Sequence, residues 1–196
     1  MRSDNPETGP RSGSGLAFPE VKLIQSKRFA DARGWFNEIY ADDLAAPGAL
    51  LAGIDFVQDN ASLSVHPGTV RGLHFQMPPF GQGKLVTVLT GAVFDVTVDI
   101  RRASPTFGRY MAVELRAGTG QQLFVPVGFA HGFMTLVPDT VVFYKVTSRY
   151  APNADRGILW NDPELGIAWP RVASEVQLSD KDRVLPTLRT ATDLFP

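Results

Sequence analysis

The stretch of residues 58–84, QDNASLSVHPGTVRGLHFQMPPFGQGK, concentrates polar side chains in an otherwise apolar, strand-rich sequence. Within it, His74 has cations and amides as near neighbours along the chain, namely Arg71, Gln76, Gln82 and Lys84. Inside a folded domain such polar groups cost free energy unless they bond to one another or to a ligand. Because an imidazole exchanges protons near neutral pH and cations attract anions, the segment predicts a pocket that transfers protons on an anionic substrate.

Composition limits the classes of function. With 196 residues, 44% hydrophobic and 20% charged, the chain has the balance of one globular domain. Its formal charge of -1 provides no overall field for nucleic acid or an anionic membrane, and no apolar run is long enough to span a bilayer. There are no cysteines, which excludes disulfides and thiolate metal sites and is compatible with a cytoplasmic location. We therefore expect neither nucleic acid nor a membrane as a partner.

The first 15 residues, MRSDNPETGPRSGSG, differ in composition from the rest of the chain. They are rich in Ser, Gly and Pro and lack the apolar core of a secretion signal, so we expect a flexible leader. Residues 16–196 are then predicted to form a single domain, a barrel with a C-terminal tail packed on it.

From residue 56 onwards the pattern is almost entirely that of β-strands. Short runs rich in Val, Phe, Thr and Leu are bounded by Gly, Pro, Asp or Ser. The predicted strands cover residues 69–76, 85–90, 93–100, 110–115, 121–125, 133–136 and 141–147, after one or two strands in 18–29 and a turn and a strand in 30–40. No helix pattern intervenes, which predicts an all-β closed antiparallel barrel or jelly roll. The few helices expected are short: residues 42–53, interrupted by Pro47 and Gly48, and one starting at Ser179.

Two spaced patterns of glycine and histidine stand out: G-x5-H-x-Q over residues 68–76 and G-x5-P-x-G-x2-H over residues 120–131. They resemble the two motifs of the cupin superfamily, a jelly-roll barrel (double-stranded β-helix) whose motif histidines point into the barrel mouth. Metal-binding cupins use two His and a Glu from the first motif and one His from the second. Here Gln76 replaces the second His, and Phe80 or Gly81 stands at the Glu position. Two neutral imidazoles and an amide are a poor donor set for a divalent ion, so we expect no metal.

A narrower resemblance extends in order from about residue 20 nearly to the C-terminus. Its segments include FADARGWFNEIY (29–40), FVQDNASLS (56–64), VRGLHFQ (70–76), VPVGFAHGF (125–133), FYKVTSRYAP (143–152) and LSDKDRVLP (178–186). These segments resemble the dTDP-4-dehydrorhamnose 3,5-epimerase family. The resemblance implies conversion of dTDP-4-dehydro-6-deoxy-D-glucose to dTDP-4-dehydro-L-rhamnose, with protons removed and returned at C3 and C5 beside the C4 ketone. It implies no redox cofactor and no metal.

Such a reaction needs a base, a group that holds the enolate oxygen, and an acid on the opposite face of the ring. The resemblance implies that His74 is the base and Tyr144 the acid. It likewise implies that Lys84 stabilises the enolate and that Asp182 orients His74.

The residues taken alone leave other interpretations open. His74 could be a hydrogen-bonded core histidine and Tyr144 a half-buried core tyrosine. Lys84 could face solvent in a loop, and Asp182 could serve only the N-terminus of a short helix. Asp95 and Asp99, which share one face of their strand, are alternative partners for His74.

Substrate-binding residues are carried over from the same resemblance. The set is Arg33, Glu38, Gln58, Asp59, Asn60, Arg71, Lys84, His131, Asp155 and Lys181. The resemblance implies that the diphosphate is bound by Arg33, Arg71 and Lys181. Gln58, Asp59 and Asn60 would contact the nucleotide or the sugar, Glu38 the base or ribose, and His131 the sugar. Asp155 stands where the family usually has Glu. Ordinary surface and turn positions are the alternative for most of this set.

The position of Arg71 raises a geometric question. Strict alternation along a strand places His74 and Gln76 on one face and Arg71 on the other. Both faces cannot line one pocket, so we expect a bulge near Gly72, or an Arg71 side chain that reaches round a strand end.

Three other functions are compatible with parts of the pattern. A single-site epimerase of a specialised deoxysugar pathway would use the same base but invert one carbon. A metal-dependent cupin oxygenase is disfavoured by Gln76, and a non-catalytic nucleotide-sugar-binding module would bind without proton exchange. The resemblance also implies a homodimer with swapped or augmented strands, in which residues 33–38 reach the neighbour's site.

Overall fold

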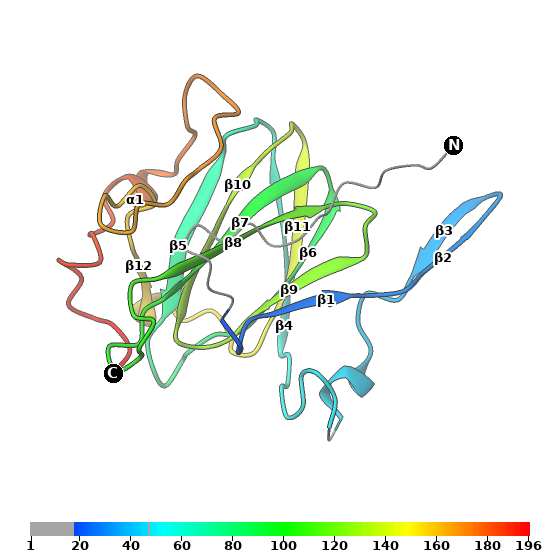
Figure 1. Ribbon diagram of the computed structural model, residues 1–196, viewed down its shortest axis with the longest axis horizontal. Coiled ribbons are helices and arrows are strands. Elements are labelled where there is room, and N and C mark those ends of the chain that lie inside the picture. The colour runs from blue at the N-terminus through cyan, green and yellow to red at the C-terminus, as the bar shows by residue number, and fades with distance from the viewer. Residues whose placement is uncertain (1–17, 47) are drawn as a thin grey trace.

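The structure, a computed structural model, describes residues 18–46 and 48–196. The leader expected at residues 1–15 and the predicted domain start at residue 16 lie outside the described residues. Two five-stranded antiparallel sheets face each other, and a two-stranded ribbon projects from them (Figure 1). No helix in this described part of the chain is long and apolar enough to cross a membrane.

The first sheet has the strand order β1-β9-β6-β11-β4 and the second the order β12-β5-β10-β7-β8. The first consists of β1 (Lys22–Gln25), β4 (Gln58–Ser64), β6 (Lys84–Thr90), β9 (Gln121–Val125) and β11 (Thr140–Val146). The second consists of β5 (Val70–Gln76), β7 (Ala92–Asp99), β8 (Tyr110–Arg116), β10 (Phe129–Thr135) and β12 (Asp155–Gly157). From β4 onwards, successive strands alternate between the two sheets, except that β7 and β8 are neighbours in the second sheet. The predicted all-β jelly roll is therefore confirmed.

The remaining elements are short. The ribbon pairs β2 (Arg28–Asp31) with β3 (Gly34–Asn37). The helical turns are η1 (Asp42–Ala45), η2 (Pro152–Ala154) and α1 (Asp180–Arg183). The start predicted at Ser179 is confirmed, since the Ser179 hydroxyl accepts a hydrogen bond from the Asp182 amide at the N-terminus of α1.

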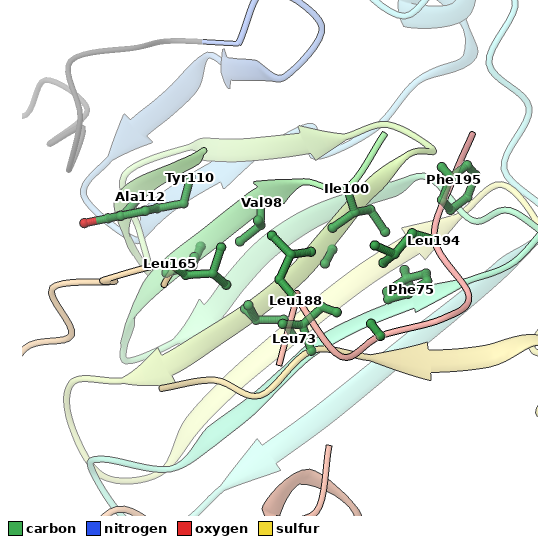
Figure 2. Packing of buried hydrophobic residues seen from close by; sticks show 14 residues of the cluster. Leu73, Phe75, Val98, Ile100, Tyr110, Ala112, Leu165, Leu188, Leu194 and Phe195 are labelled. Atoms are coloured by element: carbon green, nitrogen blue, oxygen red, sulfur yellow. The ribbon is translucent and has the colours of Figure 1, made fainter. Parts of the chain in front are cut away.

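The apolar side chains form separate layers because strand residues alternate between faces. One buried cluster lies between the sheets and includes Val86, Val113, Leu123 and Val142. A second covers the outer face of the second sheet, where Figure 2 shows Leu188, Leu194 and Phe195 of the tail beside Leu73 and Phe75 of β5. Burying each large apolar side chain stabilises the fold by about 1.5–3 kcal/mol, so the tail is bound firmly to the sheet.

Several boundaries differ from the sequence predictions. Strand β4 was not among the predicted strands, and it forms because it pairs with β11 along its whole length. Strand β10 begins at Phe129, four residues before the predicted start, because it pairs with β7 along its whole length, although His131 and Gly132 interrupt its apolar pattern. Strand β12 was not predicted, and of the predicted helix 42–53 only the single turn η1 is helical.

Candidate active site

A cavity of about 530 Å³ opens between the two sheets. Strands β5 and β10 form one wall, β6 and β11 form the other, and the tail segment 177–182 lies at one side. Among the residues proposed from the sequence, the lining contains Arg71, His74, Lys84, His131, Tyr144, Asp155, Lys181 and Asp182. One cavity therefore collects side chains that are spread over more than a hundred positions of the chain.

A bulge in β5 explains how Arg71 and His74 share the cavity. In the pairing with β10, His131 is opposite His74 but Phe133 is opposite Arg71, so β5 contains one extra residue. Gly72 lies in this bulge with φ 133°, and a Cβ there would come within 2.5 Å of the Gly132 Cα. Only glycine fits such an approach. The bulge that the sequence predicts near Gly72 is confirmed.

His74 is bonded to the tail. Its Nε2 lies 2.6 Å from Oδ1 of Asp182, and the other Asp182 oxygen accepts the Gly72 amide at 3.3 Å. Burial raises the pKa of the Asp182 carboxyl, but the hydrogen bond and charge of His74 oppose this and hold the pKa below its usual value. An ionised carboxylate at Nε2 favours the tautomer whose Nδ1 carries a free lone pair, and that lone pair can accept a proton.

A second histidine–carboxylate pair lies beside the first. His131 Nε2 is 2.9 Å from both oxygens of Asp95, and both side chains are buried. Asp99 bonds to Arg101 instead. The alternative partners considered for His74 are thus engaged elsewhere.

Lys84 lies close to both pairs. Its Nζ donates to the His74 carbonyl oxygen at 3.2 Å. Burial lowers the pKa of the Lys84 ammonium to about 8, and the negative charge of Asp95 opposes part of that shift. A lysine in this state is a cation that can bind a developing oxyanion and can also release a proton near neutral pH.

Tyr144 stands on the wall opposite His74. It lies on β11, between Val86 of β6 and Asn60 of β4, and it lines the same cavity. Burial raises the pKa of the Tyr144 phenol, an effect that the charge of Arg71 partly offsets. None of the hydrogen bonds among the described residues uses its hydroxyl group, so this group is available to a ligand in the cavity.

The mouth of the cavity carries a smaller polar cluster. Asp155 accepts hydrogen bonds from the Tyr150 hydroxyl at 2.9 Å and from the Lys181 ammonium. Tyr150 and Ser62 also line the cavity, although the sequence analysis assigned them no role. Tyr150 lies within segment 143–152, which resembles the family, and Ser62 lies two residues after Asn60 on the same strand face. The sequence therefore contained a reason to propose each of them as a site residue.

Five residues proposed from the sequence do not line this cavity. Arg33 lies in the turn of the β2–β3 ribbon, exposed and paired with Asp31, and Glu38 is exposed just after β3. Asp59 points to the outside of β4 and pairs with Lys145. Gln58 and Asn60 lie on the other face of β4 and bond to each other at 2.8 Å. A part in ligand binding for these five remains a prediction.

The donor set for a metal is limited. Each motif histidine has its own carboxylate, and Gln76, at the position of the second histidine of metal-binding cupins, is 4% exposed. In residues 18–46 and 48–196 no group of three or more His, Asp and Glu side chains is arranged to hold a metal ion.

Comparison with known proteins places this geometry in a family. The sequence model described as dTDP-4-dehydrorhamnose 3,5-epimerase matches residues 15–190. A dTDP-4-dehydrorhamnose 3,5-epimerase of Sinorhizobium fredii is 51% identical over 173 residues, which are 88% of this chain and 87% of that protein.

Solved structures agree. A 3,5-epimerase from Legionella pneumophila in complex with dTDP-4-keto-L-rhamnose has a TM-score of 0.83 and 43% identity, covering 89% of this chain and 91% of that one. A 3'-monoepimerase from Streptomyces bikiniensis in complex with dTDP-quinovose has the same TM-score but 34% identity, covering 90% and 87%. The chain belongs to the dTDP-4-dehydrorhamnose 3,5-epimerase family.

Proposed function

We propose that this protein converts dTDP-4-dehydro-6-deoxy-D-glucose to dTDP-4-dehydro-L-rhamnose by inverting C3 and C5. Its membership of the family supports the reaction class. The observation that carries the proposal is the position of His74, bonded to Asp182, on one wall of a cavity whose opposite wall presents the free hydroxyl of Tyr144.

The proposed chemistry moves protons only. His74 removes the proton from the carbon next to the C4 ketone, and the electron pair of that C–H bond becomes the enolate. Lys84 holds the negative charge on the enolate oxygen. Tyr144 then donates its proton to the same carbon from the other face, which inverts it. The proton on His74 then passes to solvent and the Tyr144 phenolate takes one from solvent, so both groups are ready for the second carbon. The product is an isomer of the substrate, so there is no net oxidation or reduction.

Asp182 acts on His74 and not on the sugar in this proposal. Its carboxylate keeps the imidazole in one tautomer and stabilises the imidazolium that forms when His74 accepts the proton. His131, whose Nε2 is bound by Asp95, would present its other ring nitrogen to a hydroxyl or carbonyl group of the sugar.

The anionic half of the substrate is assigned to the cations near the mouth. Arg71 reaches the cavity from the β5 bulge, where its guanidinium also bonds to the Ser64 hydroxyl and the Leu63 carbonyl. Lys181 stands across the mouth beside Asp155. Guanidinium and ammonium groups bind phosphate oxygens, so these two are proposed to hold the diphosphate. Gln58, Asp59 and Asn60 are proposed to contact the nucleotide.

Isotope incorporation tests the function. Substrate incubated with the enzyme in deuterated water should gain deuterium at both C3 and C5, which NMR can assign separately. Deuterium at one carbon alone would favour a single-site epimerase instead. Tight binding of dTDP with no incorporation would favour a binding module.

A homodimer is proposed with this function. The β2–β3 ribbon exposes Phe29, Trp35 and Phe36 to 53%, 55% and 66%, and such aromatic surface is commonly covered by a partner. If the ribbon carries Arg33 and Glu38 to a neighbouring site, light scattering should give twice the chain mass. Mixing inactive His74→Ala and Arg33→Ala proteins should then restore activity, because one site of each mixed dimer has both residues. No recovery on mixing, with exchange of chains confirmed, would contradict a shared site.

Two further expectations belong to the same proposal. Residues 16–196 are proposed to act as one catalytic domain, and a protein lacking residues 1–15 should then retain full activity. A cytoplasmic location, with which the absence of cysteines is compatible, can be tested by fractionating the native cells.

A further inference from the structure

Gln76 has no part in the chemistry proposed above, yet both N–H donors and the carbonyl oxygen of its side-chain amide are hydrogen-bonded. It is the last residue of β5 and is 4% exposed. Its Nε2 donates to the carbonyl oxygens of Phe80 at 2.8 Å and Arg149 at 3.1 Å. Its Oε1 accepts the Ala151 amide at 2.8 Å. One buried side chain thus makes three hydrogen bonds, each to a backbone group.

These backbone groups belong to two segments that we call the rim: residues 77–83, which join β5 to β6, and residues 147–154, which join β11 to β12. The ends of the two segments are already tied, since the Thr147 amide donates to Gly83 and the Met77 amide to Ala154. Between those ends the links are Gln76 and a single bond from Gln82 to the Ser148 carbonyl at 2.7 Å. Gln76 therefore joins the middle of one segment to the middle of the other, and the second segment has two more side-chain contacts, from the Tyr150 amide to Gln58 and from Arg156 to the Asn153 carbonyl.

The rim presents side chains to the cavity. Gln82 and Tyr150 line it, and the Tyr150 hydroxyl bonds to Asp155, which also bonds to Lys181. The base and the acid lie elsewhere, on strands β5 and β11, where His74 pairs with Gly157 and Tyr144 with Val86. A displacement of the rim would thus alter the mouth of the cavity while leaving His74 and Tyr144 in place.

Only an amide satisfies this position. A carboxylate has no N–H to donate to two carbonyl oxygens, and an imidazole has at most one donor when it also accepts. A buried polar group without its partner costs more free energy than the bond itself provides. Each hydrogen bond of this side chain, which stands at the position of a cupin metal ligand, thus holds a backbone group.

We propose that Gln76 is a positioning residue that holds the rim in the shape that binds the nucleoside diphosphate half of the substrate. It acts through Tyr150 and the Asp155–Lys181 pair at the mouth and takes no part in proton transfer. This inference rests on the proposed function, and the two can fail separately in the experiments that follow.

The first experiment uses the unaltered protein. The Ala151 amide lies in a loop, where amides commonly exchange with solvent quickly, but its bond to a buried acceptor should slow hydrogen exchange by at least about tenfold relative to an open loop. Exchange measured by NMR at this single amide gives the answer. Fast exchange would overturn the proposal, whatever the enzyme does to its substrate.

The second experiment compares Gln76→Glu with Gln25→Glu. Gln25 is a control for the substitution itself: its Nε2 also donates to two backbone carbonyls, those of Thr119 and Ser26, but it is solvent-exposed and does not line the cavity. Calorimetry with dTDP should show at least about tenfold weaker binding for Gln76→Glu, the size of one buried unsatisfied polar group. The control should bind as the unaltered protein does.

Two further measurements distinguish a positioning role from a general loss of structure: the separate effects on KM and kcat, and the pH dependence of dTDP binding. For Gln76→Glu the KM should rise at least about tenfold while kcat changes less than about threefold. A protonated carboxyl regains one donor, so the ratio of variant to unaltered Kd for dTDP should shrink as the pH is lowered from about 8 to about 5.5. Unchanged KM with reduced kcat, or a pH-independent ratio, would overturn the proposal.

Folding and function are controlled separately. If Gln76→Glu does not fold, exchange at Ala151 in the unaltered protein still decides the matter. If the unaltered protein does not bind dTDP, the proposed function fails, while protection of Ala151 still measures what Gln76 does to the rim.

Discussion

The cavity contains two histidine–carboxylate pairs whose carboxylates come from different parts of the molecule. His74 and His131 are direct partners in the register of β5 and β10. His131 bonds to Asp95 on the adjacent strand β7, and the two side chains are 7% and 0% exposed. His74 bonds to Asp182 from the tail, and 31% of its side chain is exposed.

This difference distinguishes the pair proposed to hold the sugar from the pair proposed to transfer protons. Asp95 belongs to a strand that the sheet holds on both sides, so the His131 pair is formed with the barrel itself. Asp182 reaches His74 only because the apolar tail packs on the outer face of the second sheet. His74, the proposed base, thus stays partly exposed while a segment distant in the chain supplies its partner.

The largest expected effect compares the two histidines. His74→Ala should reduce deuterium incorporation at C3 and C5 by roughly 10²–10⁴-fold, since it removes the base. His131→Ala should mainly raise KM, because its proposed role is to hold the sugar. NMR of the sugar protons in deuterated water measures both. Equal losses of kcat in two well-folded variants would remove the distinction between the pairs.

The next largest effect concerns the face opposite His74. Tyr144→Phe removes only the hydroxyl, so inversion should fall by about 10²-fold. Deuterium should still enter the substrate with retained configuration, because His74 can return a solvent-exchanged proton to the face from which it came. Chiral analysis of the recovered sugar separates exchange from inversion. Unchanged inversion in Tyr144→Phe would show that another group is the acid.

The carboxylates should respond in opposite ways to amide substitution. Asp182→Asn should lower kcat by roughly 10²–10³-fold by favouring the wrong His74 tautomer, with a smaller loss of stability than Asp95→Asn because its partner His74 is 31% exposed. Asp95→Asn should instead lower the free energy of unfolding by about 1–3 kcal/mol, because it weakens a wholly buried charge-assisted bond. Urea denaturation and steady-state kinetics on both variants test this. The reverse assignment of effects would make His131 the reactive member.

The smallest expected effect is a pH dependence at Lys84, which lies between the pairs. With a pKa of about 8, Lys84 loses its proton as the pH rises through that value, and kcat should fall on the alkaline side. Lys84→Arg keeps its charge, so its activity, though lower, should not show this decline. Between pH 8 and roughly 10.4 Lys84 is protonated in the unfolded chain more often than in the folded protein. The contribution of Lys84 to the free energy of unfolding therefore rises with pH in this range. If kcat fell at alkaline pH in both proteins alike, a group other than Lys84 would be responsible for the decline.

Much of the barrel follows from local patterns. Strands β6, β7, β8, β9 and β11 lie within about one residue of their predicted limits, because apolar alternation and flanking turn residues are local signals. Strand β4 was missed, since QDNASLS has few β-branched or aromatic residues and becomes a strand only through its pairing with β11. The helix expected at residues 42–53 forms only as the turn η1, and the segment instead packs Leu44, Leu51 and Ile54 against the first sheet.

The sequence by itself determined the kinds of groups available: two motif histidines, a lysine, a tyrosine on a strand, a capped turn at Ser179 and a glycine where a bulge was needed. Tertiary structure decided which of them meet. His74 and Asp182 are 108 residues apart, and three aspartates were compatible with the pairing until the tail was placed on the second sheet. Such contacts depend on the register between strands and on how a distant segment packs, and neither is encoded in any short stretch of residues.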